Sequence, residues 1–440
     1  MRTPRATRVS RLASAAVLSG ALTLPFALPA TAAGEPHASA PAAVGKNAVR
    51  PGAAGTAGKG ASMSEQARQK HTVRVATYNA SLNRGSEGQL VQDLSTPDHE
   101  QAQSIAEVIQ INDPDILLIN EFDYVEGGRA AELFRDNYLA VGQNGQDPVD
   151  YPYHYVAPVN TGVPSGMDLN QDGTVGGGDD AWGFGLFPGQ YGMVVYSKFP
   201  ILKEDVRTFQ QFRWKDMPQN QMPTDYYTPE QQERLRLSSK SHWDVPVQVG
   251  GTTVHVLAAH PTPPSFDGPE DRNGRRNNDE IRFWADYVTG GQEASYIYDD
   301  DGRHGGLDRG ERFVILGDYN SDPLDGDSYP GAIDQLLQHT RVRDPQQSSA
   351  GGAEAAVRQG GANLTHRTDP RYDTADFNDV PSPGNLRVDY ALPSRNLPLR
   401  DGGVFWPEPG QPGSELTGEY PFPTSDHRLV WVEVKVPGAR

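Results

Sequence analysis

The most constraining feature of this sequence is an apolar run that ends abruptly in polar groups. Residues 312–316 (RFVIL) are apolar and β-branched over the length that a buried strand needs. Residues 317–320 (GDYN) follow directly. Alternate residues of an extended chain face the same side, so Asp318 and Asn320 are expected to point together. Taken alone, this tetrapeptide is equally compatible with an Asx turn that closes a strand.

The same arrangement recurs at other strand-like segments, and the recurrence favours a functional site. Polar groups also stand at the ends of these segments at Asn79, Glu121, His260 and the pair Asp426-His427. Polar residues of a purely structural sheet are scattered along its strands. Polar groups held at the end of a buried strand are placed rigidly, as chemistry requires. The sequence therefore predicts that these positions carry ligand or catalytic groups.

Apolar periodicity predicts the elements that carry these groups. Strands are expected at residues 72–79, 115–121, 153–156, 193–196, 243–249, 253–259, 312–316, 386–392 and 429–436. Helices are expected at residues 100–111, 130–137, 279–288 and 332–337. Gly250-Gly251 predicts a hairpin between two of the strands. Long loops are expected at residues 210–241 and from the last helix to about Asn385.

The chain divides into a leader and one large domain. Residues 1–33 have the composition of a secretory signal peptide, in which arginines precede an uncharged run that ends in Ala30-Thr31-Ala32. No second apolar run follows, so the sequence predicts a secreted protein with no transmembrane segment. Residues 34–70 contain few large apolar side chains and are expected to be a disordered leader. Residues 71–437 are patterned continuously, which predicts a single large domain with long loops.

The composition narrows the class of partner. The chain has 57 acidic and 39 basic residues and a net charge of −18. This balance counts against a nucleic-acid binder that depends on a broad basic face. A local group of cations could still hold a small phosphorylated substrate. The candidates in the long loops are Arg213, Lys215, Lys240, His242, His366 and Arg367, and an ordinary surface charge is the alternative for each.

The residue types at the strand ends suit a divalent metal and acid–base chemistry. Glu121, Asp318 and Asp426 offer the hard carboxylate oxygens that Mg²⁺ or Mn²⁺ prefers. His260 and His427 carry side chains that titrate near neutral pH. A metal, a group that activates water and a second cation are what hydrolysis of a phosphate ester needs. The chain has no cysteine and no serine in a nucleophile-elbow context, which disfavours covalent catalysis through either.

The order of the motifs resembles that of a known superfamily. The motifs are Thr77-Tyr78-Asn79, Asn120-Glu121-Phe122, Ala259-His260, residues 317–323 (GDYNSDP), Arg387-Val388-Asp389-Tyr390 and Ser425-Asp426-His427. Over about residues 73–434 they resemble the endonuclease/exonuclease/phosphatase superfamily, which includes deoxyribonuclease I, exonuclease III, bacterial sphingomyelinases and inositol-polyphosphate 5-phosphatases. The resemblance implies an α/β fold, a four-layer sandwich in which two mixed β-sheets pack face to face with helices on the outside. It also implies a site at one end of the sheets.

The resemblance assigns roles to the oxygen-bearing residues. Glu121 would be the main metal ligand, with Asn79 and Asp426 nearby. Asp318 would orient the attacking water, and Asn320 would hold a phosphate oxygen.

The resemblance also assigns the two histidines. His427 would be the second catalytic group, as a base or as an electrophilic stabiliser, with Asp389 fixing its tautomer. The alternative for Asp389 is a surface ion pair with Arg387. His260 matches the second histidine of the deoxyribonuclease and sphingomyelinase branches. In deoxyribonuclease I a glutamate just before a Gln-Tyr pair orients that histidine; here Gly189 stands in its place, so no partner is assigned to His260.

The Gly- and Asp-rich segment 161–190 is predicted to be an insertion with a candidate calcium loop. Oxygen-bearing side chains alternate along it and a glycine takes the sixth position, as in an EF-hand-like loop. The predicted ligands are Asp168, Asn170, Asp172, Thr174 and Asp179. Aspartate replaces the usual closing glutamate and the flanks are Gly-rich rather than helical, so a solvated Asp/Gly turn is the alternative.

The sequence thus predicts a secreted, monomeric phosphoesterase that depends on Mg²⁺ or Mn²⁺, with a structural Ca²⁺ in the insertion. The acidic charge favours a small phosphorylated substrate or a phospholipid head group over nucleic acid. An extracellular nuclease is the alternative among enzymes. A catalytically inactive, calcium-dependent binding module is the alternative outside them, and the intact set of acids and histidines argues against it.

Overall fold

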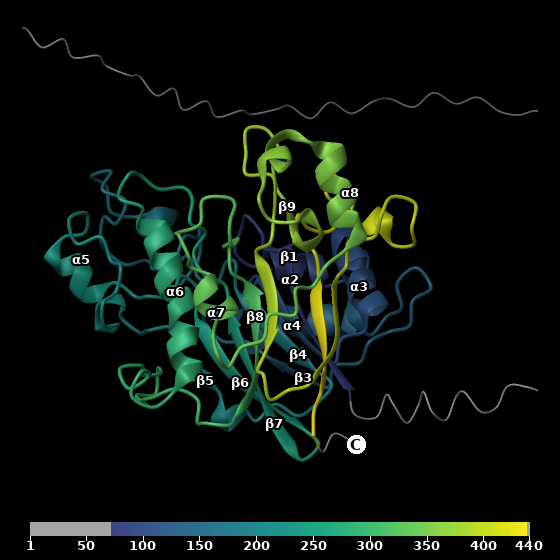
Figure 1. The fold of residues 1–440 in the computed structure, drawn as a ribbon, viewed down its shortest axis with the longest axis horizontal. Helices are drawn as coiled ribbons and strands as arrows, with labels where there is room; N and C mark the ends of the chain where they lie inside the picture. The colour runs from purple at the N-terminus through teal and green to yellow at the C-terminus, as the bar shows by residue number, and fades with distance from the viewer. Residues whose placement is uncertain (1–71, 438–440) are drawn as a thin grey trace, which may run out of the picture. The chain divides into compact units, whose positions relative to one another are not determined.

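The computed structural model describes residues 72–437, in which two mixed sheets lie at the centre (Figure 1). The strands of the sheets are β1 (Thr72–Leu82), β2 (Ile116–Phe122), β3 (Tyr153–Tyr155), β4 (Met193–Ser197), β5 (Arg207–Thr208), β6 (His242–Val249), β7 (Thr252–Ala259), β8 (Arg312–Asp318), β11 (Asp389–Pro393), β12 (Leu399–Val404) and β13 (Val430–Lys435). One sheet has the order β12-β13-β1-β2-β4-β3 and the other β11-β8-β7-β6-β5. Each contains one parallel pair, β1 with β2 and β7 with β8, among antiparallel neighbours.

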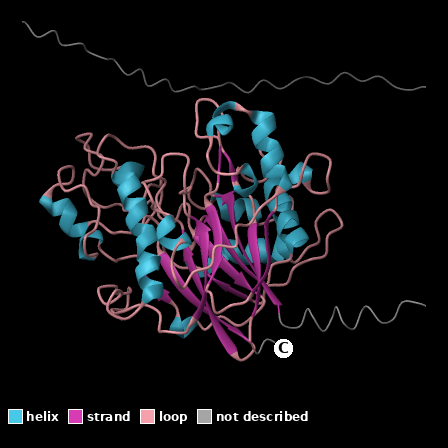
Figure 2. Cartoon of the chain, viewed as in Figure 1, coloured by secondary structure: helices cyan, strands magenta, loops and turns pink. Residues whose placement is uncertain are grey.

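The helices are α2 (Gln89–Leu94), α3 (Glu100–Asn112), α4 (Arg129–Phe134), α5 (Pro229–Arg234), α6 (Arg272–Thr289), α7 (Asp334–Leu337) and α8 (Ala350–Gln359). Helices α2, α3 and α4 pack on the outer face of one sheet and α6 and α7 on that of the other, whereas α5 lies to the side of α6 and α8 lies beyond the end of the sheets (Figure 2). A π-helical turn, Arg135–Leu139, continues α4, and a separate ribbon pairs β9 (Ala375–Asp376) with β10 (Asn385–Leu386).

Alternation of side chains along the strands produces the layers. Val75 of β1 and Val314 of β8 belong to one apolar cluster that joins the inner faces of both sheets. The neighbouring Tyr78 packs outward with residues of α3, and Phe313 packs outward with residues of α6. Since both faces of each sheet are buried, the strands are apolar almost throughout. The predicted fold class, two mixed sheets face to face with helices outside, is confirmed.

The same alternation explains where the polar groups lie. Val75, Thr77 and Asn79 share one side of β1, and Val314, Leu316 and Asp318 share one side of β8, because strand side chains repeat every two residues. Inward positions that are apolar along the strands therefore become polar where the strands end. These end positions are Asn79, Asn120, His260, Asp318 and Asp389. The site is thus the polar end of the core between the sheets.

Two helices differ from the prediction. α6 begins at Arg272, seven positions before the predicted start, because polar side chains in its first turns bond to buried backbone. Asn277 Nδ2 donates to the carbonyls of Thr262 and Tyr319, each at 2.8 Å. α8 occupies part of a predicted long loop. Its two glycines have low helix propensity, so the sequence does not predict the helix. Ser349 caps it by accepting the Gly352 N–H at 3.0 Å.

Two strand predictions also need correction. The predicted strand 386–392 is two elements, β10 and β11, because the chain leaves one sheet ribbon before it joins β8. β12 was not predicted, since its Asp and Gly residues disfavour a strand, yet it pairs with β13 along the edge of a sheet. The predicted Gly250-Gly251 hairpin between β6 and β7 is confirmed, with Val249 opposite Thr252.

The predicted signal peptide (1–33) and leader (34–70) lie outside the described residues. Within residues 72–437, no helix has the length and apolar character needed to cross a membrane.

Candidate active site

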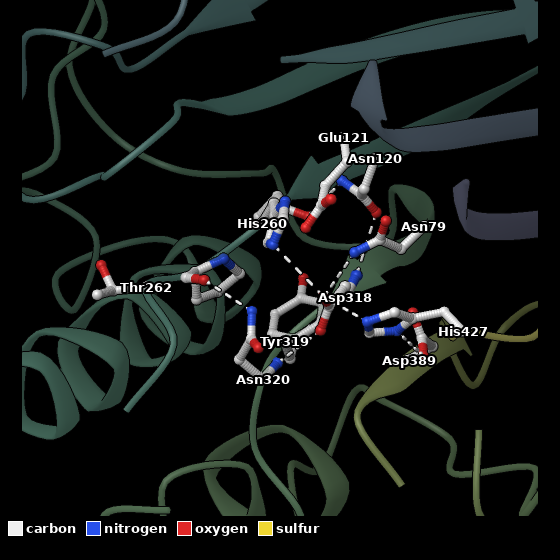
Figure 3. A network of polar contacts seen from close by, with 12 residues as sticks. Asn79, Asn120, Glu121, His260, Thr262, Asp318, Tyr319, Asn320, Asp389 and His427 are labelled. Carbon is white, nitrogen blue, oxygen red and sulfur yellow. Dashed lines mark hydrogen bonds and ion pairs between the residues drawn. The ribbon is translucent and has the colours of Figure 1, made fainter. Parts of the chain in front are cut away.

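A cavity of about 1260 Å³ opens at the polar ends of the strands. Its lining includes Glu121, His260, Asp318, Asn320, Asp426 and His427. The structure therefore brings to one place residues that the sequence separates by some three hundred positions. Asn79 and Asp389 lie directly behind this lining, in contact with Asp318 and His427 respectively (Figure 3).

The centre of the site is a buried Asp–His–Asp group. Asp318 and Asp389 are directly opposite each other on the antiparallel pair β8–β11. His427 lies between them, with Nδ1 at 2.9 Å from Asp389 Oδ2 and Nε2 at 3.6 Å from Asp318 Oδ2. Like charges opposite each other destabilise a sheet unless a cation separates them. The alternative for Asp389 is wrong, since Arg387 donates instead to Asp344, at 3.0 Å.

The surroundings of this group favour a charged His427. Burial disfavours the imidazolium, but the carboxylates of Asp389, Asp318 and Asp426 outweigh it and hold the pKa of His427 well above its usual value. Burial raises the pKa of Asp318 to about 6, although His427 and the Asn79 amide oppose the shift. At neutral pH the site thus presents a cation beside an ionised carboxylate.

His260 faces the same oxygen of Asp318 from the other side (Figure 3). Its Nε2 lies 3.4 Å from Asp318 Oδ2, and its buried Nδ1 has no hydrogen-bond partner within residues 72–437. Burial, then the charges of Lys240 and His427, lower the pKa of His260 well below its usual value. His260 is therefore neutral and His427 is charged, because Asp389 lies at Nδ1 of His427 and no carboxylate of the described residues lies at Nδ1 of His260.

The backbone at Gly189 leaves no room for a side chain. Gly189 has φ +97°, and a Cβ there would lie 2.5 Å from the Tyr124 carbonyl oxygen. A side chain of any kind is excluded at this point of the backbone. The glutamate that orients the corresponding histidine in deoxyribonuclease I therefore has no counterpart at Gly189.

Glu121 reaches the cavity through an unusual backbone conformation. By alternation along β2 it should face away from Asn120, but its φ of 57° turns the side chain into the site. Such left-handed conformations are costly for residues other than glycine and concentrate at functional sites. Asn83 Nδ2 donates to Glu121 Oε2 at 2.7 Å. Burial, with the nearby charges of Asp426 and Asp318, raises the pKa of Glu121.

Three asparagines fix the carboxylates. Asn79 Nδ2 donates to Asp318 Oδ2 at 3.1 Å. Asn120 joins the two sheets, because its Nδ2 donates to the Ala259 carbonyl at 3.3 Å and its Oδ1 accepts the Asp318 N–H at 3.1 Å. Asn320, with φ 52°, donates its backbone N–H to Asp318 Oδ1 at 2.9 Å and its side-chain amide to the Pro261 carbonyl at 3.2 Å. The orientation of Asp318 is thus set by three neighbours.

Some residues of the site were not predicted. Thr374 Oγ1 donates to Asp389 Oδ2 at 2.9 Å and accepts the Asp389 N–H at 2.9 Å. Asp123 accepts the backbone N–H groups of Arg84 and Tyr191, at 2.8 and 3.1 Å. The Glu-Phe-Asp spacing could have drawn attention to Asp123. No pattern in the sequence marks Asn83 or Thr374, which lie in loops.

The candidate calcium loop forms a turn in which aspartate side chains accept hydrogen bonds from backbone N–H groups. Asp168 accepts the N–H groups of Asp172 and Gly173, at 3.1 and 3.0 Å. Asp180, rather than the predicted Asp179, closes the loop by accepting the Gly176 N–H at 2.7 Å. Asp179 is exposed and faces the cavity instead. The remaining predicted ligands, Asn170 and Thr174, lie along the same turn, and the calcium assignment stays a prediction.

The six candidate phosphate-binding side chains differ in whether they reach the cavity. Lys240 alone among them lines the cavity. Lys215 is paired with Glu233 at 2.8 Å. His242 is buried between Ser238 and the Glu280 carbonyl, and burial lowers its pKa to about 4. Arg213 and Arg367 are exposed and His366 bonds to the Pro383 carbonyl; none of these three is part of the cavity lining.

The sequence profile of the Endonuclease/Exonuclease/phosphatase family matches residues 76–427, which is most of the chain and spans every motif of the site. The chain belongs to the endonuclease/exonuclease/phosphatase family. No curated protein matches the chain. The expected resemblance is therefore confirmed at the level of the family. Its enzymes hydrolyse phosphoesters and generally depend on divalent metals.

Several solved structures are similar to this chain. An endonuclease/exonuclease/phosphatase from Beutenbergia cavernae DSM 12333 is 17% identical, with a TM-score of 0.46, covering 84% of this chain and 72% of that one. A mannosyl-6-phosphatase from Bacteroides thetaiotaomicron is 13% identical, with a TM-score of 0.42 and coverages of 83% and 100%. Sphingomyelinase C from Streptomyces griseocarneus is 14% identical, with a TM-score of 0.41 and coverages of 82% and 99%.

The residues at the cavity fit a divalent metal of the kind used by this family. Glu121 and Asp426 both line the cavity, and their negative charges repel each other. Carboxylates gathered in this way are stabilised by a hard cation with oxygen ligands. Within residues 72–437, the group of His and acidic side chains with ligand atoms all within 4.8 Å of one another is Asp318, Asp389 and His427. That compact group contains the predicted catalytic residues rather than the predicted metal ligands.

Proposed function

We propose that this protein is a secreted, divalent-metal-dependent phosphoesterase that hydrolyses a small phosphorylated substrate or a phospholipid head group. The observation that carries the proposal is the buried Asp318–His427–Asp389 group beside Glu121 in a single cavity. A charged histidine, an ionised carboxylate and the further acids Glu121 and Asp426 together supply what hydrolysis of a phosphate ester needs.

The metal is proposed to be Mg²⁺ or Mn²⁺, held by Glu121 with Asp426 and Asn79. When bound, it would neutralise phosphoryl oxygens and position the phosphorus. The chain's own residues then divide the work. Asp318 Oδ2 accepts a hydrogen bond, and then a proton, from the water that attacks phosphorus. His427 Nε2 donates to the oxygen that takes up charge as the ester bond breaks, while Asp389 holds Nδ1.

The lining of the cavity supports the substrate class. Phe184, Phe266 and Tyr420 lie at its edge and are 54%, 89% and 87% exposed. Acidic side chains of the lining, Asp179, Asp327, Asp379 and Glu419, would repel a polyanion. An apolar and acidic rim of this kind suits an amphiphilic or small phosphoester better than a nucleic acid strand.

Secretion is part of the proposal and rests on the sequence. The basic start, the uncharged run and the Ala30-Thr31-Ala32 site are the features of a signal peptide. Expression of the full chain with a C-terminal tag should yield mature protein in the medium that begins close to Gly34. Retention of the full-length chain in the cells would contradict it.

The function is tested by a substrate screen with purified protein. Phosphomonoesters, phospholipid vesicles and plasmid DNA are each offered with Mg²⁺ or Mn²⁺, and again with excess chelator. The proposal predicts chelator-sensitive release of phosphate or of a phosphorylated head group, with little nicking of the plasmid. Plasmid nicking as the dominant activity would instead identify a nuclease. Absence of any hydrolysis would identify a binding module.

A further inference from the structure

The lining of the cavity contains a lysine whose ammonium group has no partner among the described residues. Lys240 lies just before β6 and is 6% exposed, and its side chain belongs to the cavity lining. Within residues 72–437, its ammonium group makes no hydrogen bond and no ion pair, and only charges at longer range act on it. A desolvated ammonium group without a partner is costly. An anion that enters the cavity would remove that cost.

The other basic side chains of the cavity are already engaged. Arg272 is paired with Glu270. Arg276 donates to backbone carbonyls, from Nη2 to Trp182 at 2.6 Å and from Nε to Leu237 at 2.8 Å. These arginines hold the walls of the cavity in place. Among the lysines and arginines of the described lining, Lys240 is therefore the one that is available to a ligand.

The carboxylates around Lys240 do not satisfy it. Glu280 is fully buried, and its two oxygens accept the backbone N–H groups of Ser239 and Thr262, each at 2.6 Å. Burial lowers the pKa of Lys240, whereas the charges of Glu280, Glu121 and Asp318 raise it. The carboxylates whose charges act on the ammonium group are thus Glu280, which is bonded elsewhere, and two carboxylates of the candidate active site, Glu121 and Asp318.

Lys240 also lies on a defined side of that centre. The neighbouring Ser239 Oγ donates to the His260 carbonyl at 3.4 Å, and His242 pairs with Ala259 across β6 and β7, so Lys240 lies beside His260. His260 and His427 face Asp318 Oδ2 from opposite sides (Figure 3). A phosphoryl group in front of Asp318 would therefore have the charged His427 on one side and the charged Lys240 on the other.

We propose that Lys240 binds a non-bridging phosphoryl oxygen of the substrate on the His260 side of the cavity. The proposal rests on the proposed phosphoesterase function and names the group that holds the substrate's charge. Ammonium–phosphate contacts are strong because both partners are ionised. The partner that Lys240 lacks in the structure is then the substrate itself.

A purely structural role makes a different prediction. If Lys240 only balanced Glu280 and the catalytic carboxylates, its removal would change the stability of the protein and leave phosphate affinity alone. A phosphate-binding role changes the affinity for phosphate and does not weaken the affinity for the metal. Phosphate affinity measured beside metal affinity therefore separates the two roles.

The experiment is a calorimetric titration of inorganic phosphate into the Mn²⁺-loaded protein. Lys240→Met should raise the Kd for phosphate at least about tenfold, a change of about 1.4 kcal/mol, with an undiminished affinity for Mn²⁺. The matched control is Lys215→Met, which removes a lysine from the same long loop whose ammonium group is already paired with Glu233 at 2.8 Å. Its Kd should equal that of the wild type. A Kd for Lys240→Met within twofold of the wild-type value overturns the proposal.

A second measurement does not depend on the folding of Lys240→Met. In wild-type protein labelled with ¹⁵N at lysine side chains, one ammonium signal should shift saturably with phosphate. That signal should be missing from Lys240→Arg, which keeps the charge. A phosphate-responsive signal that persists in Lys240→Arg, or no such signal in the wild type, contradicts the proposal.

Phosphate binding requires no turnover, so the two proposals fail separately. If the wild type hydrolyses no phosphoester but binds phosphate more tightly than Lys240→Met does, the proposed function is refuted and the role of Lys240 is supported. An active wild type with unchanged phosphate affinity in Lys240→Met refutes the role of Lys240 alone.

Discussion

Two Asp–His pairs in this chain have nearly the same geometry and different surroundings. In the cavity, Asp389 Oδ2 lies 2.9 Å from His427 Nδ1. On the β6–β7 hairpin, Asp244 Oδ1 lies 2.7 Å from His255 Nδ1. In both pairs burial opposes the charged imidazolium, and the carboxylate outweighs it and raises the pKa of the histidine. The pairing alone therefore does not mark a catalytic histidine.

The second carboxylate oxygen distinguishes the pairs. Asp244 Oδ2 accepts the Tyr287 hydroxyl at 2.6 Å, so both oxygens of that carboxylate are bonded within the protein. Asp389 Oδ1 is buried and has no hydrogen-bond partner in the part of the chain that the structure describes. Buried polar atoms without partners are rare in purely structural networks and accompany functional sites. The hairpin pair is complete in itself, and the cavity pair is not.

The far ring nitrogen of each histidine points to different surroundings. His427 lines the cavity, and its Nε2 lies 3.6 Å from Asp318 Oδ2, a carboxylate that is also part of the lining. His255 Nε2 lies 3.7 Å from Glu311, a carboxylate that is 44% exposed. The charge of His427 is thus available to a substrate, whereas that of His255 is directed at the surface. What lies beyond the pair decides its role.

The largest difference between the two pairs is expected when each histidine is replaced and kcat is measured. His427→Ala should lower kcat by about 10³-fold, the size expected for loss of a positioned acid–base group. The affinity for Mn²⁺, measured by calorimetry, should hardly change. His255→Ala is the control and should keep kcat within twofold of wild type. Equal losses in both variants would mean that the cavity pair acts only through the fold.

Substituting the two aspartates should separate activity from stability. Asp389→Asn should lower kcat by about 10²-fold, because His427 loses the partner that holds its charge. Asp244→Asn should lower the free energy of unfolding by about 1–3 kcal/mol, because a buried and fully bonded carboxylate is lost. Its kcat should stay near that of wild type. Denaturant unfolding and steady-state kinetics measure both, and the reverse assignment of losses would contradict the account.

Glu121→Ala should show that Mn²⁺ binds in the cavity beside the Asp389–His427 pair and not beside the Asp244–His255 pair. Loss of this carboxylate should weaken Mn²⁺ binding at least about tenfold, since removal of groups around a metal typically costs that much. Glu311→Ala, next to the hairpin pair, should bind Mn²⁺ as the wild type does. Calorimetry checks both, and equal affinity in Glu121→Ala and wild type would refute the ligand assignment.

The smallest effect concerns pH and the hairpin pair. The pKa of His255 is higher in the folded chain than its usual value, so its pairing stabilises the fold fully below that value. The stabilisation is lost as the pH rises through the folded pKa. Wild type should therefore exceed His255→Gln in free energy of unfolding more at pH 5.5 than at pH 8.5, by no more than about 1 kcal/mol. A difference that grows with pH would contradict the sign.

The site could largely be predicted because its residues obey the period of the strands. Asn79, Asp318 and Asp389 continue the inward side of buried strands, and His427 just precedes another. Glu121 was found as a strand-end carboxylate, although alternation alone would turn it outward. Its left-handed backbone, φ 57°, cannot be inferred from the residue type.

The loops could not be predicted to the same degree, because tertiary packing decides which of their charges turn inward. Lys240 and His242 are two positions apart and both buried, yet Lys240 lines the cavity and His242 bonds within the core. α8 was missed because Gly351 and Gly352 disfavour a helix. A Cβ at Gly351 would lie 2.2 Å from the Trp406 carbonyl oxygen, so the close approach of α8 requires the glycine.

The most direct test of the central claim measures hydrolysis of a soluble phosphoester by wild type and Asp318→Ala, with Mn²⁺ and with chelator. Asp318 is bonded to Asn79 and Asn120 and faces both histidines, so every feature of the site converges on it. The account predicts turnover by the wild type that chelator abolishes, and at least about a 10³-fold loss in Asp318→Ala. Turnover that survives chelator, or an unchanged rate in Asp318→Ala, would contradict it.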